Sequence, residues 1–153
     1  MSEPVLGGPI SAGMATAIGS LPHRDAHTAA ALTLRCLPEL PAAPQLPLRS
    51  AREGVIAQWI GAIPGVVVHD DGGIEVTAAF DPLGPLDTTF DSATHAGLLT
   101  FLDVAARQPL APKRVKVQIA GPLTLGAAQV AGGVDPDLAF ALGAEVSDRK
   151  SVV

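Results

Sequence analysis

Gly19, Ser20 and His23 directly follow the apolar run Met14–Ile18, a pattern typical of a buried strand that ends in a loop. In α/β proteins, ligands bind at the carboxyl ends of parallel strands. Glycine lets a ligand approach the backbone, and a serine hydroxyl both donates and accepts hydrogen bonds. Backbone amides in such a loop can hold a carboxylate or another anion. The segment therefore predicts a ligand-binding corner, with a tight turn and a capping serine as the alternative.

A second strand-to-helix corner is predicted near the end of the chain. The run Val115–Ile119 is the clearest strand in the sequence, and it leads through Gly121 into a segment that contains Thr124. Gln118 places an amide inside this apolar strand, and a buried amide needs hydrogen-bond partners. A ligand or a barrel interior can supply them, and so can neighbouring backbone. The predicted substrate-binding residues are therefore Ile18, Gly19, Ser20, His23, Gln118 and Thr124.

Several other chemistries lack the residues that they need. Cys36 is the only cysteine, and the sequence has no Cys-x-x-Cys or His-x-Cys pair from which a closed zinc site could be built. No glycine-rich phosphate loop follows a strand. Pro22 occupies the position of the second glycine in the Gly-x-Ser-x-Gly motif, which argues against serine hydrolase chemistry. We therefore predict no metal ligand and no catalytic residue within this sequence.

The elements expected in the first third of the chain are a strand, a helix and an extended segment. The strand covers Ala15–Ile18, and Asp25 is the predicted N-cap of a helix that ends near Leu37, with Cys36 in its core face. Four prolines in residues 37–47 exclude a helix there and disfavour a central strand. This extended segment is either a further barrel strand or a rigid connector.

Further along, helices alternate with a hairpin. Ser50–Glu53 matches a capping box, which predicts a helix with an apolar stripe that extends to Ile63. Residues 66–77 are predicted to form a β-hairpin around a Gly-rich turn. Two more helices are expected, one over 92–107 and one from Asp137 to about Glu145 after the N-cap Asp135. The residues on or near the core face of the first are Leu99, Leu102, Val104, Ala105 and Ala106. The alternation favours a parallel α/β arrangement with the hairpin as an insertion.

Length and composition limit the possible functions. The chain has 153 residues, a net charge of −5 and 48% hydrophobic residues, which suffices for one core. A complete (β/α)8 barrel needs roughly 250 residues. The ten Lys and Arg residues are scattered, so no basic face for nucleic acid is expected. The single cysteine, the lack of a signal peptide and the short apolar runs predict a cytoplasmic protein without membrane partners.

The last six residues, Asp148–Val153, depart from the pattern that precedes them. The DNA sequence GATCGGAAGAGCGTCGTG, a common sequencing-library adapter, encodes the same hexapeptide. An ordinary polar C-terminus is the alternative. We therefore expect a flexible lead-in at 1–13, an incomplete barrel domain at 14–147 and a non-native tail at 148–153.

Three motifs, Ala17–His23, Pro44–Pro47 and Gln118–Thr124, resemble segments of the cobalamin-independent methionine synthase family. The chain is most similar to short, single-barrel relatives in the superfamily shared with uroporphyrinogen decarboxylase, over about residues 14–131. The resemblance implies the N-terminal half of a (β/α)8 TIM barrel. It also implies transfer of a methyl group from a donor, such as a folate, to a small-molecule thiol such as homocysteine, as in methionine biosynthesis.

The resemblance also implies roles for individual residues. In the family, an Ile-Gly-Ser segment contacts the amino-acid backbone of homocysteine, which corresponds here to Ile18, Gly19 and Ser20. The family's zinc favours the thiolate form of the substrate. Its ligands, a His-x-Cys pair, a Glu and a further Cys, have no counterpart here. Zinc is therefore expected only in a longer parent protein, and this chain alone is expected to be inactive. Arg49 and Glu53 lie near the position of the family's substrate-binding carboxylate.

Two other interpretations remain open. A uroporphyrinogen decarboxylase-like fragment would need no metal, but it would use several arginines near the first loop, where this sequence has only Arg24. A non-catalytic α/β interaction module would fold as a stable, monodisperse protein.

Overall fold

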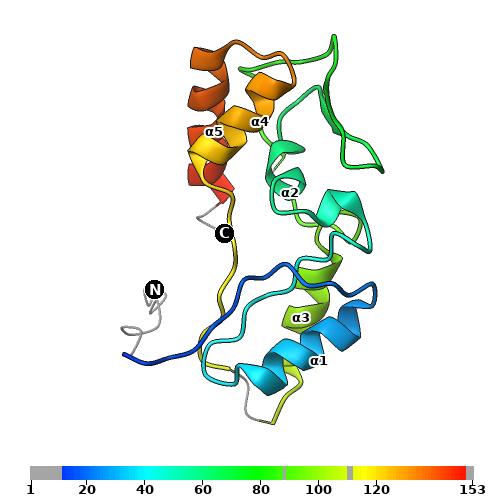
Figure 1. Ribbon diagram of the computed structural model, residues 1–153, viewed down its shortest axis with the longest axis vertical. Coiled ribbons are helices and arrows are strands. Elements are labelled where there is room, and N and C mark those ends of the chain that lie inside the picture. The colour runs from blue at the N-terminus through cyan, green and yellow to red at the C-terminus, as the bar shows by residue number, and fades with distance from the viewer. Residues whose placement is uncertain (1–11, 88, 110–111, 151–153) are drawn as a thin grey trace, which may run out of the picture.

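The computed structural model describes residues 12–87, 89–109 and 112–150 and shows a mixed α/β protein (Figure 1). Helix α1 packs beside α3 at one end of the molecule, and α4 packs beside α5 at the other, with α2 between the two pairs. The elements are α1 (Ala26–Cys36), the 3-10 helix η1 (Ala51–Glu53), α2 (Ala57–Ile60), β1 (Val66–Val68), β2 (Ile74–Val76), α3 (Ala96–Ala106), α4 (Pro122–Ala131) and α5 (Pro136–Lys150).

The helix predicted after Asp25 is confirmed as α1. One oxygen of Asp25 accepts hydrogen bonds from the Thr28 amide at 2.7 Å and from its hydroxyl at 2.6 Å, which caps the helix. The buried face contains Ala29, Ala30 and Thr33. Cys36 is exposed, so its predicted place in the core is wrong. The last turn of α1 presents that side of the helix to solvent.

Three extended segments, residues 14–21, 41–46 and 115–120, lie in parallel in that order. Isolated parallel bridges join Ser20 to Gln45 and Ala42 to Lys116. The regular strands predicted at 15–18 and 115–119 are therefore wrong, and Ile18 is 67% exposed rather than buried. Pro41 and Pro44 in the middle segment have no N–H group, so a continuous ladder cannot form. The middle segment nevertheless pairs on both sides, as a strand does.

The capping box predicted at Ser50–Glu53 does not form. The Ser50 hydroxyl accepts from the Arg52 amide at 3.3 Å, and the Glu53 carboxylate turns into the protein instead of reaching back to Ser50. Gly54 then adopts an extended conformation, with φ −67° and ψ 149°. The predicted long helix is therefore replaced by η1 and the single turn of α2. Tertiary hydrogen bonds to Glu53 outweigh the local cap.

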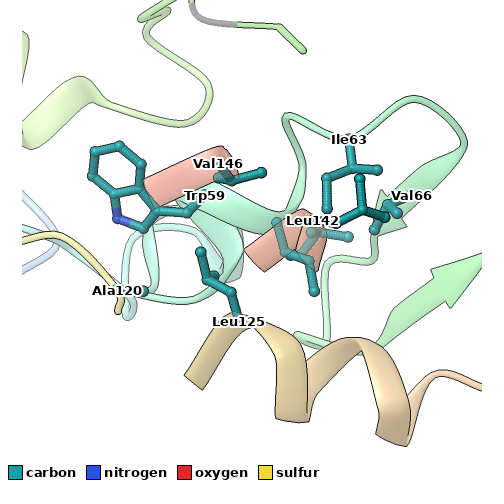
Figure 2. Close-up of a cluster of buried hydrophobic side chains, with 9 residues drawn as sticks. Trp59, Ile63, Val66, Ala120, Leu125, Leu142 and Val146 are labelled. Atoms are coloured by element: carbon teal, nitrogen blue, oxygen red, sulfur yellow. The ribbon is translucent and has the colours of Figure 1, made fainter. Parts of the chain in front are cut away.

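Two hydrophobic clusters form the core. The larger one joins α2 to the hairpin, α4 and α5, and Figure 2 shows three of its members, Trp59, Leu125 and Val146, which come from α2, α4 and α5. The smaller one lies between α1 and α3 and includes Ala43, Leu98 and Phe101. The core therefore spans both pairs of helices and the extended segment between them.

The core face predicted for helix α3 is only partly correct. Its buried residues are Ala96, Gly97, Leu98, Phe101 and Ala105. Ala105 is therefore confirmed and Val104 packs against the smaller cluster, whereas Leu99, Leu102 and Ala106 are exposed. A side chain at Gly97 would collide with the carbonyl group of Pro44. This close approach sets the rotation of the helix about its axis.

The hairpin and the last helix follow the sequence closely. Strands β1 and β2 are antiparallel, with Val66 opposite Val76, and Gly72 in their turn has a φ of 88°. Asp135 caps α5 through its bond from the Leu138 amide at 3.2 Å. Helix α5 continues to Lys150, beyond the end predicted near Glu145. Residues 1–11 of the predicted lead-in and 151–153 of the predicted tail lie outside the described residues.

Among the described residues, no helix combines the length and the apolar character required to cross a membrane.

Candidate functional site

The Gly19–Ser20 corner is the point where the three extended segments are linked by hydrogen bonds. The Gly19 amide donates to Oε1 of Gln118 at 3.1 Å, and the Gly19 carbonyl accepts from the Gln45 amide at 2.8 Å. The Leu21 amide donates to the Gln45 carbonyl at 3.0 Å. Gly19 is buried, and a Cβ there would lie 2.6 Å from the Ala43 carbonyl oxygen. Only glycine fits at this position.

Ser20 is the exposed residue of this corner. Its hydroxyl donates to Oε1 of Gln45 at 3.4 Å, which is longer than the roughly 2.5–3.0 Å typical of such bonds. The amides of Gly19 and Leu21 already donate within the protein. The Ser20 hydroxyl is therefore an exposed polar group that this corner offers to a ligand.

A series of amide groups, which we call the amide relay, extends from this corner into the core. Nε2 of Gln45 donates to Oε1 of Gln58 at 2.8 Å, and Nε2 of Gln58 donates to the Thr94 carbonyl, also at 2.8 Å. Both glutamines are only 4% exposed. Together with the Ser20 contact, the relay joins the first two extended segments to α2 and to the turn before α3.

The other predicted site residues are only partly assembled. The Gln118 side chain accepts a hydrogen bond from the Gly19 amide, so its partner is backbone, one of the two possibilities that the sequence left open. His23 is half-buried, and its Nδ1 atom has no hydrogen-bond partner among the described residues. Thr124 is exposed in the first turn of α4, and no described hydrogen bond joins it to the corner. Gly19, Ser20 and Gln118 therefore come together, whereas Ile18 and Thr124 face solvent.

Sequence reasoning missed Gln58 and His95. Gln58 lies in the helix predicted after Ser50 but outside its apolar stripe, so no pattern in the sequence indicates that it is buried. His95 is 2% exposed, its Nδ1 atom lies 2.8 Å from the Thr94 hydroxyl, and its ring meets the rings of Trp59 and Phe90 edge-on. Gln45, in contrast, lies in a motif that the sequence does single out.

A cavity of about 240 Å³ lies beside the relay, between α2, β1 and the loop before α3. Arg52, Gln58, Asp91 and His95 are among the residues that line it. Hydrogen bonds from the Thr94 amide and hydroxyl lower the pKa of Asp91 below its ordinary value. The walls come from segments far apart in sequence, which explains why no motif predicts the cavity.

The described residues do not fit a zinc site. Cys36 is exposed at the end of α1, and no group of three or more His, Cys, Asp or Glu side chains in the described part of the chain could hold a metal ion. No step of a reaction through zinc can therefore be derived from these residues.

Comparisons with protein-family models, curated proteins and solved structures give no match to this chain.

Proposed function

We propose that this chain provides part of the substrate pocket of a methionine synthase-like methyltransferase, which transfers a methyl group to a thiol such as homocysteine. The zinc that such an enzyme uses would be held by residues other than those described here. Ile18, Gly19 and Ser20 would contact the amino-acid part of the substrate. Gln118 would hold the Gly19 backbone in place.

The observation that supports this proposal is the meeting of the three motifs on which the family resemblance depends. Gly19 belongs to the first motif, and it bonds to Gln45 of the second and to Gln118 of the third. Gln118 lies 99 positions after Gly19 in sequence. Motifs that matched the family by chance would have no reason to meet at one corner.

The order of the extended segments also supports a partial (β/α)8 barrel. Residues 14–21, 41–46 and 115–120 are parallel neighbours in chain order, and each of them leads into helical structure. Successive strands of a (β/α)8 barrel have this order, and ligands bind at their carboxyl ends. The Gly19–Ser20 corner lies at the carboxyl end of the first segment. The hairpin of β1 and β2 would be an insertion between the second and third strands.

The role of the chain's own residues in this proposal is to bind and orient the substrate. The exposed Ser20 hydroxyl donates to Gln45 and can at the same time accept a hydrogen bond from the ammonium group of a bound amino acid. Gly19 lets the first segment approach the Ala43 carbonyl closely, and Gln118 keeps the loop from shifting.

Calorimetric titration with L-homocysteine tests this proposal. We expect binding to the wild-type chain, and we expect Ser20→Ala to weaken it by about tenfold, because a hydrogen bond to a charged group is lost. Thr16→Ala is the matched control, since it removes an exposed hydroxyl from the same segment. Absence of homocysteine binding by the wild-type chain, or equal binding by both variants, would refute the proposal.

A further inference from the structure

We propose that Gln58 is a positioning residue for the Gly19–Ser20 corner and acts through Gln45. This inference rests on the proposed function for its ligand, but its structural part can be tested without one. Gln58 lies on α2 and has no described contact with Ser20 itself. Its effect would pass through two hydrogen bonds of 2.8 Å within the core.

The Thr94 carbonyl, at the buried end of the amide relay, sets the direction of every hydrogen bond in it. The Thr94 carbonyl can only accept, so Gln58 must turn its NH₂ group toward Thr94 and its oxygen toward Gln45. Gln45 must then turn its NH₂ group toward Gln58, which directs its own oxygen toward Ser20. If either side-chain amide flipped, two acceptors or two donors would face each other and a hydrogen bond of the relay would be lost.

This fixed direction determines what Ser20 presents to a ligand. With Oε1 of Gln45 facing it, the Ser20 hydroxyl donates inward, and its lone pairs face solvent. A ligand N–H group, such as the ammonium of an amino acid, can bind those lone pairs without breaking the relay. Loss of Gln58 would leave the Gln45 amide free to rotate, and the Ser20 hydroxyl would lose its fixed orientation.

The burial of the relay supports a positioning role for Gln58. Gln45 and Gln58 are each 4% exposed, and burying an amide is costly unless it is hydrogen-bonded. Methionine, of similar length, would fill the same space without that cost.

The first experiment compares Gln58→Met with Gln129→Met. Gln129 is a matched control because it is also a buried glutamine with two hydrogen bonds, which its Nε2 donates to the carbonyls of Leu125 and Ala139, but it lies between α4 and α5. Both variants are compared at a temperature at which circular dichroism shows them folded. We expect Gln58→Met to raise the dissociation constant for L-homocysteine about 3- to 10-fold, and Gln129→Met to leave it within about twofold.

A ligand-free measurement separates this inference from the proposed function. In NMR spectra of the side-chain amides, the Gln45 NH₂ protons should exchange faster with water in Gln58→Met than in the wild-type chain or in Gln129→Met. Unchanged exchange of these protons would overturn the inference. If wild-type chain binds no homocysteine, the proposed function fails, and the exchange data alone decide whether Gln58 positions Gln45.

A conservative variant supplies a signature that a purely structural role would lack. In Gln58→Glu, the protonated carboxyl group can donate to the Thr94 carbonyl and accept from Gln45, whereas the ionised group can only accept. Both forms of the carboxyl group keep an acceptor for the Gln45 NH₂ protons, so these protons should exchange more slowly in Gln58→Glu than in Gln58→Met. Equal exchange of the Gln45 NH₂ protons in Gln58→Glu and Gln58→Met would contradict the inference.

Discussion

At the scale of single residues, Glu53 shows how one carboxylate links two elements. It is fully buried, and its Oε1 pairs with Arg49 at 2.5 Å while its Oε2 accepts from the Gly97 amide at 2.9 Å. The bond to Gly97 joins η1 to the start of α3. The carboxylate is therefore occupied within the protein and is not available to a substrate amino group.

Replacement of Glu53 should destabilise the fold. We expect Glu53→Ala to lower the free energy of unfolding by about 1–3 kcal/mol, because the Gly97 amide loses its buried acceptor and Arg49 loses its partner. Urea unfolding followed by circular dichroism measures this change. Glu53→Gln is the control, since it keeps an acceptor for Gly97 and should cost less. Equal stability of wild type and both variants would mean that this pairing does not form in solution.

The bond between Gln118 and Gly19 makes a second prediction at this scale. In Gln118→Leu, the Gly19 amide loses its acceptor, and its hydrogen exchange should accelerate about 2- to 10-fold. Exchange followed by NMR or mass spectrometry over the first segment measures the effect. Thr124→Ala removes an exposed hydroxyl on α4 and should leave the Gly19 exchange rate unchanged. A similar acceleration in both variants would place Thr124 in the same network.

At the scale of elements, one aspartate caps α1 and another stabilises the turn before α3. Asp25 caps α1, and Asp91 accepts from the amides of Ala93 and Thr94 in the turn before α3. Hydrogen bonds from Thr28 and Thr94, respectively, lower the pKa of each carboxyl group below its ordinary value of 3.8. The folded state therefore favours the ionised form of both carboxyl groups.

The sign of the resulting pH dependence follows from these lowered pKa values. A carboxyl group with a lower pKa in the folded state stabilises the protein above its unfolded pKa, and that contribution is lost as the pH falls through the folded pKa. We expect Asp91→Asn to lose stability at neutral pH and to show a smaller fall in thermal midpoint between about pH 5 and about pH 2. Thermal unfolding of both proteins across this range checks the prediction. The same fall in both would rule out a contribution from Asp91.

Capped helices and the hairpin are the elements that the sequence predicts well. The hydrogen bonds that form these elements span only a few residues, as in the caps at Asp25 and Asp135 and the turn at Gly72. A short stretch of sequence is therefore enough to predict each of them. The capping box at Ser50 has the same kind of pattern, yet it fails. Glu53 finds stronger partners in a distant segment, and local preference then gives way.

At the scale of the whole molecule, the described structure leaves much apolar surface exposed. Ile18 is 67% exposed and Leu123 is 75% exposed, and both lie in or next to the three extended segments. Val115, Val117 and Ile119 of the third segment are also partly exposed. Apolar surface and unpaired strand edges favour association.

We therefore expect this chain, when expressed alone, to associate as its concentration rises. Sedimentation velocity across a concentration series measures the size of the species formed. Leu123→Gln should reduce this association more than Leu83→Gln, since Leu83 is 94% exposed but lies in the loop after the hairpin. A monomeric preparation that unfolds cooperatively would contradict the prediction.

The sequence by itself determined the class of the fold, the starts of α1 and α5, the hairpin and the identity of the Gly19–Ser20 corner. These features depend on bonds between near neighbours or on the residue types within one segment. Only the tertiary structure decided that Gln118 serves Gly19, that Gln45 and Gln58 connect Ser20 to the core, and that Glu53 turns inward. Each of these contacts joins segments that meet only after the chain between them has folded, and no local pattern specifies which partner a buried polar group will find.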